Sequence, residues 1–273
     1  MRILFVIIAL VWSTTAALAQ VTVCSWNVQN FGKSKKDTTL QFMAKQVLQC
    51  DILAIQEINT GPDGAQTLAK LVDILNRISG KKWISSISAP TTSDNPHEKE
   101  RYAYIWQDAK VKAQGKGYLD NSTSATIVRE PYIMNFKASG NVFTLVNFHA
   151  VPQKKNPAQE LAQFKDYPSR FTTYPFVILG DFNTKANHNV FNPLKNLGYQ
   201  LAFQGEKTTL RQQCVHNDCK ANDYDNMIYD ARKMTIVSKQ VIDFYTLMGY
   251  DMKAARKVSD HIPIQVQFKF KFK

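Results

Sequence analysis

The chain lacks the short motifs of several common enzyme classes. Its 273 residues contain no G-x-S-x-G nucleophile elbow, no P-loop and no H-E-x-x-H pair. They also contain no internal repeat, no low-complexity segment and no Pro/Gly/Ser-rich linker long enough to divide the chain. These absences argue against nucleophilic serine hydrolysis, P-loop nucleotide binding and zincin chemistry, and they favour one domain over two.

Long apolar runs are absent beyond the first twenty residues. At the N-terminus, Arg2 precedes the apolar run "ILFVIIALVW", and "TTAALAQ" then provides an A-x-A-like cleavage site. This order predicts a secretory signal peptide over residues 1–19, cut near Ala19, because the apolar run is too short for a comfortable membrane span. We therefore expect a soluble domain over residues 20–273, secreted or periplasmic, without membrane insertion.

Cysteine is scarce, with four residues in the chain. Cys214 and Cys219 lie in the polar segment "QQCVHNDCKAND", where a small-loop disulfide is expected in an oxidising compartment. Cys24 and Cys50 adjoin apolar strand patterns, which leaves two alternatives: a disulfide between them or two buried free thiols. His216 lies between the first two cysteines, but a zinc site would need a fourth ligand and tighter spacing.

Acidic residues are in the minority. The chain has 34 Lys and Arg against 22 Asp and Glu, a formal net charge of +12 and a pI of about 9.4. Such a balance favours polyanionic partners, namely nucleic acid, anionic lipid or a charged cell surface. Charge alone does not choose among them.

Apolar runs and amphipathic patterns alternate along the chain. Strands are predicted at 21–28, 51–58, 82–88, 101–106, 132–138, 142–150, 176–183, 224–230 and 261–270. Helices are predicted at 37–50 with Asp37 as N-cap, at 63–79, at 157–171 and at 190–198. This alternation predicts an α/β fold in which helices lie outside the sheets.

Polar residues able to do chemistry recur where the predicted strands end. Strand ends meet at the rim of a sheet, where a rigid scaffold holds several groups around one cleft. We therefore expect these residues to form one site: Asn27, Glu57, His149, Asp181, Asn183, Asp225, Asp260 and His261.

The residue types at these positions favour metal-assisted phosphoester hydrolysis. Glu57 and Asp260 adjoin buried strands and together form half a shell for Mg²⁺, with Asn27 and Asp181 nearby. A histidine held by a carboxylate exchanges protons near neutral pH, and His149 and His261 are the candidates. In the turn of "VILGDFNT", Asp181 can orient a water, and Asn183 can donate a hydrogen bond to a phosphoryl oxygen.

Six motifs in order resemble the endonuclease/exonuclease/phosphatase superfamily: "SWNVQNFG", "ILAIQEI", "NFHAVP", "ILGDFNT", "YDNMIYD" and "SDHIPI". They extend from Ser25 to Ile264. The resemblance implies a four-layer α/β/β/α sandwich of two packed mixed sheets, with the active site at its rim. The superfamily includes deoxyribonuclease I, abasic-site endonucleases, sphingomyelinases and inositol phosphatases.

Two further segments, "EKERYAYIW" and "IVREPYI", resemble the deoxyribonuclease I branch. This likeness implies that Glu100 orients His149 and that Asp225 orients His261. Arg129 and Tyr102 would be substrate contacts by the same analogy. The metal and the scissile phosphate would be bound by Asn27, Glu57, Asp181, Asn183 and Asp260. The chain departs from that branch after "QE", where Ile58, Asn59 and Thr60 replace an arginine that enters the DNA minor groove.

These observations lead to an expected function: a secreted, monomeric endonuclease that hydrolyses DNA with low sequence specificity and leaves 5′-phosphate ends. Mg²⁺ is the expected cofactor, with Mn²⁺ and structural Ca²⁺ as alternatives, and activity on RNA is left open. One competing hypothesis is a phosphodiesterase acting on lipid head groups, disfavoured because no exposed aromatic loop is apparent. The other is a catalytically dead binding module, disfavoured because every catalytic position holds a suitable residue.

Overall fold

The computed structural model describes residues 20–271. The predicted signal peptide, residues 1–19, lies outside the described residues. Within the described part of the chain, no helix combines the length and the apolar character needed to cross a bilayer.

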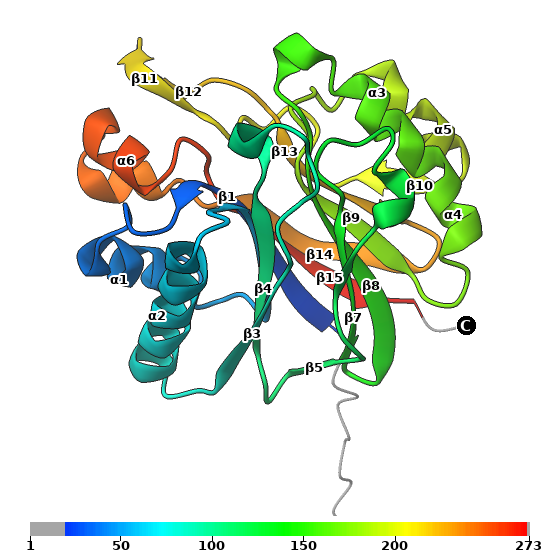
Figure 1. Ribbon diagram of the computed structural model, residues 1–273, viewed down its shortest axis with the longest axis horizontal. Coiled ribbons are helices and arrows are strands. Elements are labelled where there is room, and N and C mark those ends of the chain that lie inside the picture. Colours follow the sequence, from blue (N-terminus) through cyan, green and yellow to red (C-terminus); the bar gives the residue numbers. More distant parts are fainter. Residues whose placement is uncertain (1–19, 272–273) are drawn as a thin grey trace, which may run out of the picture.

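Two mixed β-sheets form the centre of the molecule (Figure 1). In the first sheet β1 and β2 are parallel, and in the second β8 and β9 are parallel, while all other neighbours are antiparallel. In sheet order, the first contains β14 (Met234–Val241), β15 (Ile264–Phe270), β1 (Gln20–Phe31), β2 (Ile52–Ile58), β4 (Arg101–Gln107) and β3 (Trp83–Ile87). The second contains β10 (Tyr199–Leu201), β13 (Asp225–Asp230), β9 (Phe176–Asp181), β8 (Asn141–His149), β7 (Tyr132–Ala138) and β5 (Val111–Ala113), with β6 (Tyr118–Leu119) paired to β7.

Helices cover the outer face of each sheet. On the first sheet lie α1 (Asp37–Gln46), α2 (Pro62–Ser79), α6 (Met252–Val258) and the 3₁₀ helix η6 (Phe244–Met248). On the second lie α3 (Ala158–Leu161), η4 (Ala162–Asp166), α4 (Tyr167–Arg170) and α5 (Asn192–Asn196). Four short 3₁₀ helices complete the order: η1 (Pro96–Glu98), η2 (Asn121–Thr123), η3 (Gln153–Lys155) and η5 (Asn189–Phe191). The predicted four-layer α/β/β/α sandwich is confirmed.

Alternation along the strands divides the apolar residues among three cores. In β1, Val21 and Val23 face the second sheet, whereas Cys24, Trp26 and Val28 face the helical layer of α1, α2 and α6. Both faces are therefore buried, which explains why this strand is an almost continuous apolar run. The third core lies between the second sheet and its own helices.

Several local predictions differ from the structure. Asp37 is the first residue of α1, and Lys36 holds the N-cap position without a side-chain cap bond. The helix predicted at 157–171 is broken into α3, η4 and α4. Pro168 lies in the first turn of α4, because proline fits the start of a helix but interrupts a helix that continues through it. The strand predicted from His261 begins at Ile264.

The polar cysteine-containing segment is a hairpin of β11 (Leu210–Val215) and β12 (Asp218–Lys220), which protrudes from the sandwich (Figure 1). A disulfide joins Cys214 to Cys219 within it, the pairing that the sequence made plausible. Of the two alternatives for Cys24 and Cys50 the structure has the disulfide, with the two Cα atoms 5.8 Å apart. This bond joins Cys24 in β1 to Cys50, which lies just before the start of β2.

Candidate active site

Three chemical groups are brought side by side by strand register in the second sheet. His149 at the end of β8 pairs with Asp181 at the end of β9, and Asp181 pairs with Asp225 at the start of β13. Side chains at paired positions lie on the same face of a sheet. The second sheet thus presents an imidazole and two carboxylates in one row.

The first sheet supplies its groups from irregular strand ends. The pairing of β1 with β2 shifts register between Asn27 and Phe31, and that of β2 with β4 shifts between Ile55 and Ile58. Glu57, inside the second irregularity, has φ 62°. A left-handed conformation is strained for a glutamate and recurs at functional sites, as do bulges.

Gly180 explains how β9 can lie so close to β8 beside the site. Its φ is +135°, and a Cβ there would lie 1.9 Å from the carbonyl oxygen of Phe148. No other residue fits this position without separating the strands that carry His149 and Asp181. The glycine of "LGDFN" is therefore a requirement of the site's geometry.

Glu100 and His149 form a buried pair. His149 Nδ1 lies 2.8 Å from Glu100 Oε2, and the two residues are each 5% exposed. Arg129 Nη1 lies 3.6 Å from the same carboxylate oxygen. Glu100, from the segment before β4, fixes the ring so that Nε2 faces the cavity.

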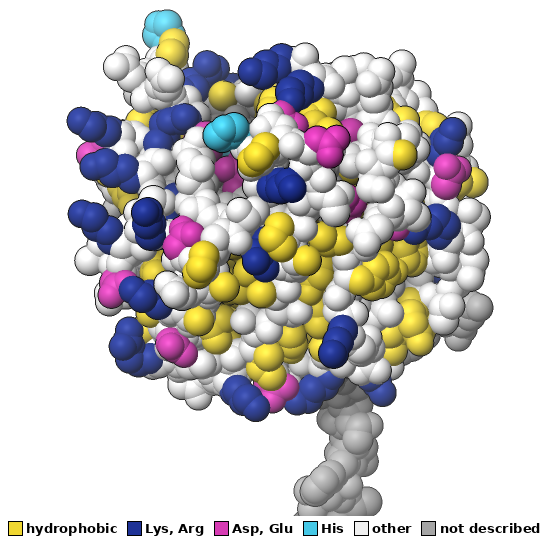
Figure 2. Space-filling model, in the orientation of Figure 1, with side chains coloured by type: hydrophobic (Ala, Val, Ile, Leu, Met, Phe, Trp, Pro, Cys, Tyr) yellow, Lys and Arg dark blue, Asp and Glu magenta, His cyan; other side chains and the backbone are white. Residues whose placement is uncertain are grey.

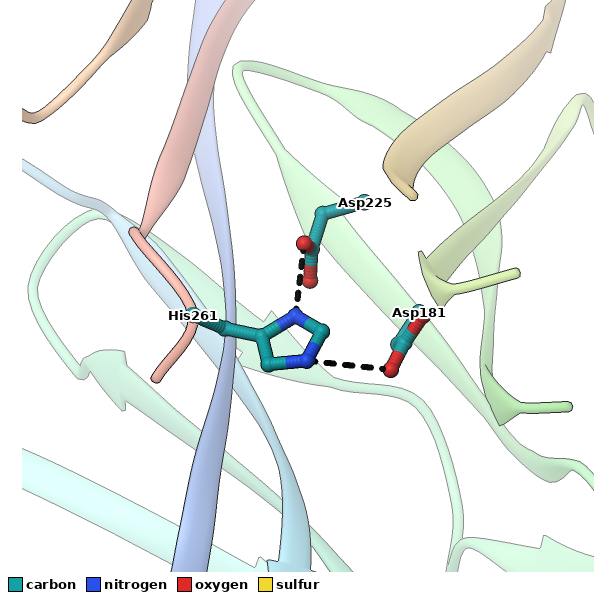
Figure 3. A group of neighbouring side chains, drawn as sticks. All are labelled: Asp181, Asp225 and His261. Carbon is teal, nitrogen blue, oxygen red and sulfur yellow. Dashed lines mark hydrogen bonds and ion pairs between the residues drawn. The ribbon is translucent and has the colours of Figure 1, made fainter. Parts of the chain in front are cut away.

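Asp225 and His261 form a second pair of the same kind (Figure 3). His261 Nδ1 lies 2.8 Å from Asp225 Oδ2, which also accepts a hydrogen bond of 2.7 Å from Thr208 Oγ1. Figure 3 shows the imidazole between Asp225 on one side and Asp181 on the other. The structure thus brings together both histidine–carboxylate pairs expected from the sequence, whose catalytic roles stay predictions.

Asp181 Oδ2 is the point on which the site converges. His149 Nε2 lies 3.4 Å from it, and His261 Nε2 lies 3.5 Å from it. The side-chain amides of Asn27 and Asn183 also donate to this oxygen, at 3.1 and 3.3 Å. Two imidazoles held at their Nδ1 atoms therefore face one buried carboxylate oxygen with their Nε2 atoms.

The two histidines have opposite electrostatic surroundings. Burial, assisted by the charge of Arg129, lowers the pKa of His149 to about 4. Burial also raises the pKa of Glu100 to about 7, against the opposing effect of Arg129, so both shifts disfavour the charged form of this pair. Burial alone would lower the pKa of His261, but Asp225 and Asp181 outweigh it and raise this pKa well above its ordinary value. Environments that separate two pKa values are typical of acid and base partners.

The donor set beside the histidines fits a hard divalent cation. Asn27 Nδ2 donates to Glu57 Oε1 at 3.0 Å, so Asn27, Glu57 and Asp181 form one connected group. Asn27 Oδ1 is buried without a hydrogen-bond partner in the described part of the chain. Carboxylate and amide oxygens are the ligands that Mg²⁺ and Mn²⁺ prefer. Asp181, Asp225 and His261 also lie within metal-ligand distance of one another, although the last two already form a hydrogen-bonded pair.

Asp260 lies at the edge of this group. Its Oδ2 accepts a hydrogen bond of 3.1 Å from Gln29 Nε2, and Arg256 Nη2 lies 3.5 Å from it. The carboxylate is half-buried and does not line the catalytic cavity. Its role as a metal ligand stays a prediction.

A polar cavity of about 340 Å³ is lined by six of the candidate residues: Glu57, Glu100, His149, Asp181, Asn183 and His261. Arg129 also lines it, although this side chain is only 9% exposed and donates to the backbone carbonyls of His149 and Ala150. Tyr102, expected to contact substrate, has no exposed surface, so that expectation is corrected. Its hydroxyl instead donates to the carbonyl of Arg129 and accepts from the backbone N–H of His149.

Sequence reasoning missed three supporting residues. Thr208 Oγ1 donates to Asp225 Oδ2 and accepts from the backbone N–H of Asp225. Ser259 Oγ donates to the carbonyl of Asn27 at 2.7 Å and accepts from the backbone N–H of His261 at 3.0 Å. Buried Lys35 donates to the carbonyls of Lys257 and Val258 at the end of α6. Only Ser259 carried a signal, since it opens the "SDHIPI" motif.

A family comparison agrees with this geometry. A model described as the Endonuclease/Exonuclease/phosphatase family matches residues 24–261. The chain belongs to this family. Every catalytic and metal-binding candidate described above lies within the matched residues.

Named relatives and solved structures of this family extend the comparison. A protein named "Deoxyribonuclease" from Thioalkalivibrio sp. (strain K90mix) is 26% identical over 97% of this chain and 75% of its own length. "Deoxyribonuclease gamma" from Rattus norvegicus is 25% identical over 89% of this chain and 82% of its own. The structure of D. rerio TDP2 with a single-strand DNA product covers 92% of this chain and 99% of its own at 14% identity, with a TM-score of 0.64, and supports the fold alone.

Proposed function

We propose that the protein is a divalent-metal-dependent endonuclease that hydrolyses DNA phosphodiester bonds. The observation that carries the proposal is the arrangement of His149 and His261, whose Nε2 atoms face the same oxygen of Asp181 while carboxylates hold their Nδ1 atoms. Two fixed imidazoles that face one point suit proton removal from a water and proton delivery to a leaving oxygen. The deoxyribonuclease relatives favour DNA as the substrate.

In this proposal His149, whose pKa is lowered, accepts the proton of the attacking water. Water attacks phosphorus, the P–O3′ bond breaks, and His261 delivers its proton to the departing 3′ oxygen. The second product keeps the phosphate on its 5′ carbon. Asn183, which lines the cavity, is the proposed contact to a phosphoryl oxygen, and Glu100 and Asp225 hold the two rings.

Glu57, Asp181 and the free Oδ1 of Asn27 would hold the cation, with Asp260 beside them. When bound, such a cation neutralises charge on the phosphate oxygens. Mg²⁺ is the proposed ion, because it binds one or two carboxylates together with substrate phosphates.

We further propose that residues 20–273 act as one secreted domain with low sequence specificity. Two disulfides fit an oxidising compartment, and residues 1–19 read as a signal peptide. The basic charge supplies phosphate contacts, which position a protein on DNA without reading its bases.

One observation favours the lipid phosphodiesterase alternative. Contrary to the sequence-based expectation, an apolar and aromatic surface exists between η6 and α6, where Leu247 is 70% exposed and Tyr250 is 57% exposed. Such a surface can lie against a membrane. The experiment that tests the proposal therefore includes a lipid substrate.

The test is incubation of purified residues 20–273 with supercoiled plasmid, RNA or sphingomyelin vesicles, each with Mg²⁺ or EDTA. We expect plasmid nicking that requires Mg²⁺ and yields 5′-phosphate ends, detected by ligation. Hydrolysis of sphingomyelin alone would support the lipid enzyme instead. Absence of metal-dependent nicking would overturn the proposal.

A further inference from the structure

A second cavity of about 190 Å³ adjoins the one that contains the two histidines, and Asn183 lines both. It lies between the loop that follows β9 and the segment around η3. The catalytic cavity is lined by four carboxylates, whereas the second cavity is lined by none and includes Lys185 and His188. Its charge therefore suits an anion.

Thr184 gives this cavity an unused donor. Its Oγ1 is buried and has no hydrogen-bond partner among the described residues, and the residue is 6% exposed. A buried hydroxyl without a partner is costly, and a bound hydrogen-bond acceptor would remove that cost. Lys185 is exposed and forms no ion pair within the described residues.

We infer that this cavity binds a phosphate of the substrate strand next to the one that is cleaved. The inference rests on the proposed function, because it assigns the second site to the same polynucleotide. Phosphate oxygens only accept hydrogen bonds, and the hydroxyl of Thr184 and the ammonium of Lys185 donate them. Since Asn183 borders both cavities, a strand whose charges recur about every 3.4 Å of helix axis reaches from one to the other.

The experiment compares Thr184→Val/Lys185→Gln with the wild type and with Lys116→Gln. Lys116 is an exposed lysine in the loop between β5 and β6 and lines neither cavity, so it matches the change of charge. Each protein is assayed with Mg²⁺ on duplex DNA and on thymidine 5′-(p-nitrophenyl phosphate), which has one phosphodiester and no neighbouring phosphate.

For the double variant we expect KM for DNA to rise roughly tenfold, because a tenfold change corresponds to the loss of one charge-assisted hydrogen bond. The slope of log K for DNA binding in EDTA against log salt should become shallower by about 0.9, the value for one phosphate. Hydrolysis of the small ester should follow the wild type, and Lys116→Gln should follow it in every assay.

If the wild type cleaves DNA and the double variant has an unchanged KM and salt slope, the inference is overturned and the proposed function stands. An equal loss on both substrates would also overturn it, because the cavity would then only support Asn183. A wild type that cleaves neither substrate contradicts the proposed function itself. Lys185→Gln, at an exposed position, keeps the test valid should Thr184→Val impair folding, which circular dichroism detects.

Discussion

Glu98 and Glu100 lie two residues apart, but their carboxylates have different surroundings. Glu100 is buried against the His149 ring, while Glu98 pairs with Lys155 at the edge of the cavity. Glu100→Gln replaces the carboxylate that holds His149 Nδ1 and fixes the orientation of the ring, so kcat for plasmid nicking should fall by about 100-fold or more. Glu98→Gln should stay within about twofold of the wild type, because Glu98 pairs with Lys155 and holds neither histidine. Equal losses in the two variants would contradict the assignment of Glu100.

His261 separates an enzyme from a binding module. His261→Ala should lower kcat by roughly 100- to 10,000-fold, because the leaving oxygen loses its proton donor. Affinity for DNA, measured by fluorescence anisotropy in EDTA, should be retained, since phosphate contacts elsewhere carry the binding. His216→Asn, at the exposed tip of the β11–β12 hairpin, is the matched control. Loss of DNA affinity together with activity in His261→Ala would argue against a proton-transfer role.

Lys35 predicts a pH effect on stability. Burial lowers its pKa to about 8 from 10.5, against the opposing charges of Glu57 and Asp260. Below the lower value both folded and unfolded chains hold the proton, and the folded protein bears the full cost of the buried charge. Between the two values the unfolded chain keeps a proton that the folded protein releases, so this residue's contribution to stability rises with pH.

Urea unfolding of the wild type and of Lys35→Met at about pH 7 and about pH 9.5 measures this effect. The difference in unfolding free energy should move in favour of the wild type by on the order of 2 kcal/mol between the two conditions. Lys36→Met, at the exposed neighbouring position, should show no such change. A pH-independent difference for Lys35→Met would contradict the buried charge.

At the level of elements, strands buried on both faces could be predicted because their apolar runs are continuous. β14 could not, since one side of it is exposed and residues such as Ser238, Lys239 and Gln240 interrupt the pattern. The β11–β12 hairpin has the same character, because polar residues such as Arg211, Gln212 and Gln213 interrupt its apolar ones. Such strands form because a neighbour offers backbone hydrogen bonds, which leaves little trace in side-chain composition.

The residues of the candidate site also fall into those that could be predicted from the sequence and those that could not. Groups that adjoin buried strands, such as His149 and Asp181, could be found because their polarity contrasts with the run before them. Thr208 and Ser259 act through contacts with Asp225, 17 residues away, and with Asn27, 232 residues away. Their roles arise from tertiary packing of loops, and loop residues of this kind are common in any polar segment.

The two disulfides differ in the length of chain they close. Cys24–Cys50 spans 26 residues and joins β1 to the segment before β2, whereas Cys214–Cys219 spans five within the hairpin. From loop closure, Cys24→Ala/Cys50→Ala should lower the unfolding free energy by about 3.5 kcal/mol and Cys214→Ala/Cys219→Ala by about 2 kcal/mol. Urea unfolding of both pairs checks the order, and the reverse order would contradict it.

At the scale of the whole molecule, charge is arranged for contact with a polyanion. Lys and Arg outnumber Asp and Glu across the face shown in Figure 2, and many lie on its upper left side around the β11–β12 hairpin and α6. The acidic groups that matter for chemistry are buried in the rim instead, at Glu100, Asp181 and Asp225. In the proposed function, a basic exterior around a recessed acidic site would attract phosphates and leave the cation site negative.

This arrangement predicts that salt inhibits the cleavage of long DNA far more strongly than it slows the hydrolytic step itself. If six to ten phosphates are contacted, kcat/KM for plasmid should fall by about 10³- to 10⁵-fold between about 50 and 200 mM NaCl. Hydrolysis of thymidine 5′-(p-nitrophenyl phosphate), which releases few counterions, should change little over the same range, because the buried histidine–carboxylate pairs are screened weakly. Parallel salt profiles for both substrates would show that the basic surface contributes nothing to binding DNA and that recognition is confined to the catalytic cavity.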